Sequence, residues 1–187
     1  TYAALQYDTE RFVDVMGEQV TGELDGQEWS AYAEAGYNWD LSPQLRVQPL
    51  ASLQYAAVGL DAYRETGGAS ALSYAEQTHE SLKGSLGARL TQVLFGSASG
   101  LPTTGQLRGR WVHEFGDTQA SVDTSFASDP GAVFTIRDGE MARDSAVLGA
   151  GLSTNLTRQL RAYADYDVRL NSDETVHMLS AALQYRW

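Results

Sequence analysis

The sequence has no cysteine among its 187 residues, which excludes a disulfide framework, a thiolate metal site and a thiol nucleophile. It is also poor in basic residues, because 13 lysines and arginines stand against 24 acidic residues, for a formal net charge of −11. Binding to nucleic acid and docking on an anionic membrane surface both require basic patches. The charge balance therefore argues against both functions.

No apolar run approaches the roughly 20 residues of a transmembrane helix. The longest uncharged run, residues 90–107, is rich in Gly, Ser, Thr and Pro and is typical of a connection. Such a chain resembles a soluble protein by average hydropathy, but the lipid face of a β-barrel is apolar only at every second residue. The chain has no signal peptide and Thr1 is not an initiator Met, so we expect it to begin inside a longer precursor.

What the chain does have is alternation, most clearly at its C-terminus. Residues 175–187 carry one apolar row, made of Leu179, Ala181, Leu183, Tyr185 and Trp187. Successive side chains of a strand point to opposite faces, so this row predicts one apolar face. The segment is long enough to cross a bilayer as a tilted strand of about 9–11 residues. We interpret it as the closing strand of an outer-membrane β-barrel, with the last strand of a soluble sandwich as the alternative.

The same pattern recurs along the chain and predicts an all-β, antiparallel, up-and-down transmembrane β-barrel with eight strands. The predicted strands cover residues 1–15, 29–39, 47–57, 82–90, 107–115, 146–152, 160–170 and 175–187. Ten tyrosines and 4 tryptophans outnumber 5 phenylalanines, as suits a membrane interface. An even strand count is typical of bacterial barrels.

The predicted connections are of two kinds. Residues 40–44, 155–159 and 171–174 are short turns, residues 17–27, 61–80 and 116–143 are long polar loops, and 95–105 is intermediate. We expect extended β-structure in 61–80 and a hairpin of residues 120–126 and 133–136 in the longest loop. Short periplasmic turns and long outer loops are typical of bacterial barrels. With the C-terminus in the periplasm, the 116–143 loop is extracellular.

Charged residues of the predicted strands fall almost wholly on one parity. An Arg or Lys on the lipid face near the midplane costs about 2–4 kcal/mol, so this parity is predicted to face a wet lumen. The predicted lumen-lining residues are Glu34, Arg89, Arg108, Arg110, Glu114, Arg161, Asp165, Asp167 and Arg169. The predicted lipid-facing or aromatic-girdle residues are Trp29, Tyr37, Trp39, Tyr55, Trp111, Phe115, Tyr166 and Tyr185. His113 breaks the rule, and we place it near an interface beside Trp111.

Two interpretations of the lumen charges are open. They contact a linker helix or a passenger, or they pair with one another and only fix the barrel wall, which we favour because pairing makes buried charge tolerable. The inward glycines Gly36, Gly87, Gly149 and Gly151 leave room inside. That room accommodates a helix or merely eases strand curvature.

Catalytic and cofactor motifs are missing. The chain contains neither a Gly-x-Ser-x-Gly elbow nor a His-Glu-x-x-His motif. Its three histidines fall in different predicted elements, whereas a metal site needs converging ligands. We expect no catalytic residue, no metal and no cofactor.

A series of short motifs resembles the translocator domain of classical type V autotransporters, specifically the C-terminal portion of its β-barrel. The most specific match is Arg110-Trp111-Val112-His113-Glu114-Phe115-Gly116. The others, in the family's order, are Glu34-x-Gly36-Tyr37, Val47-x-Pro49-x-Ala51-x-Leu53-x-Tyr55, Leu86-Gly87-Ala88-Arg89, Arg143-Asp144-Ser145-Ala146, Gly149-Ala150-Gly151-Leu152, Tyr163-Ala164-Asp165-Tyr166-Asp167 and Leu183-x-Tyr185-x-Trp187. Together they cover nearly the whole chain.

The resemblance implies a monomeric twelve-stranded barrel in a Gram-negative outer membrane. Its partners are then outer-membrane lipid or detergent, its own secreted N-terminal passenger with a linker helix in the pore, and the barrel-assembly machinery. That machinery is expected to recognise the final strand through Leu183, Tyr185 and Trp187. The family's pore helix and first four strands have no counterpart in residues 1–187, so these eight strands correspond to the last eight of twelve.

Two other functions stay open. One is a small self-contained outer-membrane barrel, acting as an adhesin or structural protein through loops 61–80 and 116–143. An eight-stranded barrel has room only for its own side chains and passes no polypeptide. The other is a soluble ligand-binding barrel such as a lipocalin, which requires apolar residues inside and charges outside, the reverse of the parity found here.

Overall fold

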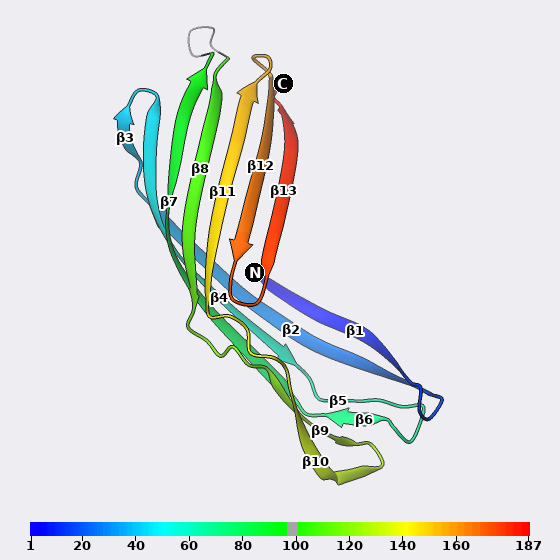
Figure 1. Ribbon diagram of the computed structural model, residues 1–187. Coiled ribbons are helices and arrows are strands. Elements are labelled where there is room, and N and C mark those ends of the chain that lie inside the picture. Colours follow the sequence, from blue (N-terminus) through cyan, green and yellow to red (C-terminus); the bar gives the residue numbers. More distant parts are fainter. Residues whose placement is uncertain (97–100) are drawn as a thin grey trace. The chain divides into compact units, whose positions relative to one another are not determined.

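The computed structural model describes residues 1–96 and 101–187, which form β-strands joined by turns and loops (Figure 1). Among these residues no helix is long and apolar enough to cross a membrane. Their strands are β1 (Tyr2–Val13), β2 (Glu18–Gly36), β3 (Trp39–Ser42), β4 (Leu45–Leu60), β5 (Tyr63–Arg64), β6 (Leu72–Tyr74), β7 (Gln77–Phe95), β8 (Thr103–Glu114), β9 (Ser121–Phe126), β10 (Asp129–Arg137), β11 (Asp144–Asn155), β12 (Leu160–Leu170) and β13 (Thr175–Tyr185).

The larger sheet confirms the predicted all-β, antiparallel arrangement. Its eight long strands follow the order β1-β2-β4-β7-β8-β11-β12-β13, and the short β3 pairs with β4. Strands that follow one another in the chain are neighbours in the sheet, apart from the inserted short strands, as in an up-and-down topology. In the part of the chain that the structure describes, β1 and β13 are edge strands and the sheet is not closed.

A second sheet is built on the connections, in the order β10-β9-β6-β5. The hairpin predicted in 116–143 is confirmed as β9 and β10, and the extended structure predicted in 61–80 as β5 and β6. The sequence did not indicate that these two segments pair with each other. In the structure β6 pairs with β9, with Leu72 opposite Phe126. The β9–β10 register shifts between Asp129 and Val133, in a stretch that contains Pro130 and Gly131.

The predicted polar loop at 17–27 is wrong. Strands β1 and β2 pair without interruption from Tyr2↔Trp29 to Val13↔Glu18, so the loop shrinks to a turn at residues 14–17. Gly17 occupies the left-handed region in that turn, with φ +64°. Backbone hydrogen bonds between two strands form whether or not the strands have an apolar face. A two-stranded ribbon with polar side chains on both faces is therefore not detected from the alternation of apolar residues.

Other boundaries also differ from the predictions. Strands β7 and β8 are longer than predicted, so 95–105 is a connection only between Phe95 and Thr103, and its residues 97–100 lie outside the described residues. The turn predicted at 40–44 is wrong for its first residues, because β3 pairs with β4 there. Phe115 follows β8 rather than ending it. The turns predicted at 155–159 and 171–174 are confirmed, because β12 begins at Leu160 and ends at Leu170.

The chain divides into two compact units. Unit 1 comprises Thr1–Tyr32, Gln54–Leu82 and Phe115–Met141, and unit 2 comprises Ala33–Leu53, Lys83–Glu114 and Ala142–Trp187. Four apolar side chains are buried among the described residues: Val20, Ala71 and Leu72 in unit 1 and Leu50 in unit 2. Unit 2 therefore has hardly any apolar core, although its strands carry rows of leucines.

Candidate functional site

The centre of the charged face of unit 2 is Arg108 on β8. Its guanidinium donates to both carboxylate oxygens of Asp167, at 2.8 Å from Nε and 2.5 Å from Nη2, and to Asp165 Oδ1 at 2.8 Å from Nη1. The two aspartates lie two residues apart on β12, so their side chains share a face. A planar guanidinium has enough donors to engage both carboxylates, one of them through two parallel hydrogen bonds.

Two glycines of β11 make room for this cluster. Gly149 lies opposite Arg108 on one side and Asp167 on the other, and Gly151 lies opposite Asp165. A Cβ on Gly149 would collide with the Asp167 carboxylate and lie 2.6 Å from Arg108 Nε, and one on Gly151 would collide with Asp165. At Gly149 and Gly151, the space that was predicted to accommodate a helix or to ease strand curvature is filled by the ion-paired side chains.

A second ion pair links distant strands of the same unit. Arg110 Nη2 on β8 lies 2.8 Å from Glu34 Oε2 on β2, and both side chains are half-buried. Arg108 and Arg110 have the same parity, so one row of β8 supplies the cations of both clusters. Five of the nine predicted lumen-lining residues are thus brought into ion pairs with one another.

The other four predicted lumen residues have different surroundings. Arg89 Nη1 donates to Gln48 Oε1 at 3.2 Å, and Arg161 Nη2 donates to Ser153 Oγ at 2.8 Å. Glu114 lies 3.9 Å from Lys83 Nζ. Arg169 is exposed and makes no ion pair within the described ranges. The sequence did not indicate Gln48, Ser153 or Lys83 as partners, because parity gives the face of a side chain but not its neighbour.

Two polar hollows lie on unit 2. One, of about 280 Å³, is lined by residues that include Arg161, Asp165 and Tyr163. The other, of about 390 Å³, is lined by residues that include Arg46 and Arg89. Within residues 1–96 and 101–187, no cluster of three or more His, Cys, Asp and Glu side chains is arranged to hold a metal ion.

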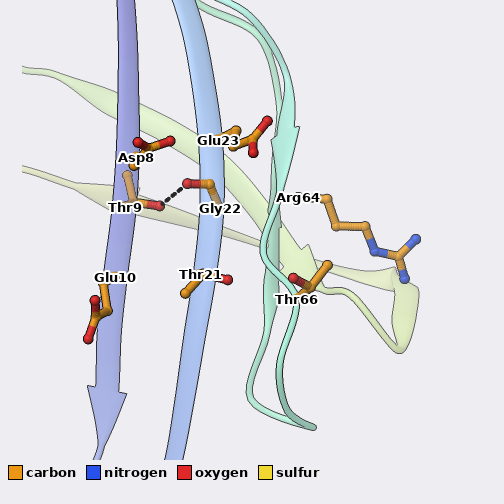
Figure 2. A pocket seen from close by; sticks show the side chains of 8 residues that line it. All are labelled: Asp8, Thr9, Glu10, Thr21, Gly22, Glu23, Arg64 and Thr66. Carbon is orange, nitrogen blue, oxygen red and sulfur yellow. Dashed lines mark hydrogen bonds between the residues drawn. The ribbon is translucent and has the colours of Figure 1, made fainter.

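A third hollow, of about 520 Å³, lies in unit 1 between β1, β2 and residues 64–66. Figure 2 shows the carboxylates of Asp8, Glu10 and Glu23 on the paired strands, with the Arg64 side chain pointing away from them. Thr9 Oγ1 donates to the backbone oxygen of Gly22 at 3.1 Å. Three carboxylates against one guanidinium make the lining of this hollow acidic.

The other parity of unit 2 is apolar and exposed. Leu179 is 81% exposed and Leu183 71%, although both lie in a regular strand paired on one side. All predicted girdle residues are exposed as well, namely Trp29, Tyr37, Trp39, Tyr55, Trp111, Phe115, Tyr166 and Tyr185. No described part of the protein covers this apolar row.

Several polar atoms of side chains on this outward parity form hydrogen bonds near Trp111 and Tyr166. Trp111 Nε1 donates to Asp144 Oδ1 at 2.9 Å, and His113 Nδ1 lies 2.8 Å from the same oxygen. Tyr166 Oη lies 2.7 Å from His177 Nδ1. Asp144 and His177 share the outward parity of Trp111 and Tyr166, but the sequence did not indicate these pairs, because only the strand register brings the partners together.

The comparison that decides the family is a match of the autotransporter beta-domain to residues 1–167. The chain belongs to the autotransporter beta-domain family. The extracellular serine protease of Serratia marcescens is 24% identical over 189 residues, covering 100% of this chain and 18% of the relative. Esterase EstA of Pseudomonas aeruginosa is 32% identical over 171 residues, covering 87% of this chain and 25% of the relative.

This membership confirms the predicted resemblance and the translocator role that it implied, since the beta-domain is the translocator of an autotransporter. It also places the domain in an outer-membrane family. Both relatives are named as enzymes, but the chain spans only about a fifth to a quarter of their length. Their activities therefore do not transfer to these residues.

Proposed function

We propose that this domain is the C-terminal, eight-stranded portion of a closed outer-membrane barrel that anchors an N-terminal passenger and supports its secretion. The observation that carries the proposal is the contrast between the two faces of unit 2. One face holds the ion pairs of Arg108 and Arg110, and the other exposes a row of leucines. Soluble proteins rarely expose large contiguous apolar patches, whereas lipid makes such a face favourable.

In this proposal the charged parity lines a wet lumen and the apolar parity faces hydrocarbon. The pairing of Arg108 with Asp165 and Asp167 supports the interpretation that these charges fix the barrel wall. Arg89 and Arg161, whose hydrogen bonds go to an amide and a hydroxyl, are then the residues available to the passenger or its linker helix. Residues 1–187 form one translocator domain, and four further strands complete a twelve-stranded monomeric barrel.

The C-terminus lies in the periplasm, and the connections that carry β5, β6, β9 and β10 are extracellular. The barrel-assembly machinery binds β13 through Leu183, Tyr185 and Trp187, which are all exposed. The domain is non-catalytic, and its partners besides the passenger are outer-membrane lipid and the assembly machinery. A self-contained adhesin-like barrel is not favoured, because the match of the autotransporter beta-domain covers residues 1–167.

Arginine substitutions at two neighbouring positions of β13 test this proposal in the full-length protein. Leu179→Arg puts a cation on the lipid face, which costs about 2–4 kcal/mol near the midplane, and we expect loss of assembly and of passenger secretion. Ser180→Arg is the matched control, because Ser180 lies opposite Asp165 and the new cation faces a carboxylate. Assembly is measured by heat-modifiable gel mobility in the outer-membrane fraction. Equal effects of the two substitutions contradict the face assignment.

A further inference from the structure

Residues 65–72, here called the strap, connect β5 to β6 and lie along the β1–β2 ribbon within unit 1. Thr66 exchanges two backbone hydrogen bonds with Thr21 of β2, at 2.8 and 2.9 Å. Gly67 follows in the left-handed region with φ +112°, and a Cβ there would lie 2.5 Å from the backbone oxygen of Gln19. Both the backbone conformation and the close approach therefore require glycine at this position.

The strongest fastening of the strap is an ion pair with β1. Arg11 Nη2 lies 2.6 Å from Glu65 Oε2, and Arg11 Nε lies 3.3 Å from Glu65 Oε1. Arg11 Nη2 also donates to the backbone oxygen of Ser70 at 3.0 Å, and Glu65 Oε2 accepts from the Leu72 N–H at 2.9 Å. Glu65 is only 4% exposed. One guanidinium thus holds both ends of the strap.

A second fastening comes from the start of β2. The Glu18 carboxylate accepts hydrogen bonds from the N–H groups of Ala69 at 3.1 Å and Ser70 at 2.9 Å. The neighbouring Ser70 hydroxyl and these two backbone bonds hold the pKa of Glu18 below its usual value. Gly68 lies so close to this carboxylate that a Cβ would be 2.5 Å from Glu18 Oε2.

The strap leads directly into the second sheet. The Ala127 N–H donates to the Ala71 oxygen at 2.8 Å, and Leu72 pairs with Phe126 of β9. Ala71 and Leu72 belong to the few buried apolar side chains of unit 1. Removing the strap from the ribbon therefore disturbs the anchoring of β6 and β9 as well.

We propose that the Arg11–Glu65 ion pair is the lock that ties the strap to the β1–β2 ribbon. While the lock is closed, the extramembrane sheet β5-β6-β9-β10 is tied to the β1–β2 ribbon. When it opens, strap and sheet detach together, while the strands of unit 2 stay folded. The lock is a conformational device of the outer loops and does not depend on which passenger the protein carries.

The substitutions Arg11→Gln and Glu65→Gln, alone and combined, test the lock in the full-length protein in outer membranes. The matched control is Arg46→Gln, which removes the exposed Arg46–Asp40 pair of unit 2. The readouts are hydrogen exchange of the Thr66, Ser70 and Leu72 amides and proteinase K cleavage inside residues 65–72. Heat-modifiable mobility reports separately on the membrane part.

We expect exchange and cleavage in the strap to rise at least about tenfold in Arg11→Gln, because the buried Glu65 loses its counter-charge, and to rise less in Glu65→Gln, because the remaining Arg11 side chain is 39% exposed. The double variant is expected to be no worse than the singles, and the control is expected to match the unchanged protein. Strap exchange that stays the same in Arg11→Gln overturns the proposal, as does loss of heat-modifiable mobility in parallel with strap opening.

If Arg11→Gln fails to assemble, Arg11→Lys still tests the lock. Lysine keeps the charge but cannot reach both Glu65 and the Ser70 oxygen with a planar fork, so we expect intermediate exchange in the strap. Exchange equal to that of the unchanged protein in Arg11→Lys contradicts a lock based on the guanidinium geometry. Failure of the barrel proposal leaves these outcomes unaffected, because every contact of the lock lies within unit 1.

Discussion

Units 1 and 2 use the same residue types in opposite ways. In unit 1 the apolar Val20 is fully buried, and the buried Glu65 pairs with Arg11, as in a protein surrounded by water. In unit 2 Leu179 and Leu183 are the exposed residues, and the ion pairs of Arg108 share the opposite face. The difference supports the proposal that hydrocarbon lies against one face of unit 2, whereas the contacts of Val20 and Glu65 in unit 1 are of the kind that water favours.

After Leu179→Arg, the largest effect that distinguishes the two units is expected from Gly149→Val. The new side chain would occupy the space of Arg108 and Asp167, so we expect the substitution to destabilise unit 2 by about 3 kcal/mol. The measurement is the urea midpoint of unfolding from detergent micelles. Gly139→Val is the control, since no atom lies within 4 Å of a Cβ there. A Gly149→Val midpoint equal to that of the control would refute the steric role of Gly149.

A smaller effect is expected from Arg108→Gln, which leaves Asp165 and Asp167 without their cation. Both carboxylates are partly buried, and we expect a loss of about 2 kcal/mol, less than for a fully buried pair. Denaturant unfolding in micelles measures this loss. The double variant Asp165→Asn with Asp167→Asn, in an Arg108→Gln background, is expected to recover stability. Absence of recovery would mean that Arg108 acts by packing rather than by charge.

The smallest effect is expected from pH, and it concerns unit 1. The pKa of Glu18 is lowered in the folded strap, so its contribution to stability is present above the unfolded value of 4.5 and is lost as the pH falls through the folded value. We expect strap exchange, corrected for the intrinsic pH dependence, to rise on acidification below about pH 4.5. Glu65 is the other charged group of the strap, and its partner Arg11 lies on β1. Glu18→Gln is expected to flatten this rise, and an unchanged profile would assign it to another group.

The alternation of side chains predicted much of unit 2 and little of unit 1. Residues 160–170 were predicted with the observed boundaries, because an apolar row on one face of a strand leaves a period of two in the sequence. The ribbon at 17–27 has polar residues on both faces, so it left no such signal. Arg11 lies in the predicted strand 1–15 and Glu65 in the predicted loop 61–80, and nothing in either segment indicated the other.

The charged site was predicted as a face but not as a set of pairs. Parity placed Arg108, Asp165 and Asp167 on one face, yet strand register decides which of them meet, and these partners lie more than fifty residues apart in the chain. The glycines were the most misleading feature. Gly149 and Gly151 indicated free space, and the space is filled by side chains of neighbouring strands, which only the register of β8, β11 and β12 reveals.

The most direct test of the central claim uses the absence of cysteine from residues 1–187, since a single introduced cysteine is then the one thiol of this domain. The full-length protein in outer membranes would carry Leu179→Cys or Ser180→Cys and be treated with a small water-soluble thiol reagent. The account predicts labelling at position 180, which faces the wet lumen, and protection at position 179, which faces lipid. Labelling at 179 with protection at 180, or equal labelling at both, would contradict it.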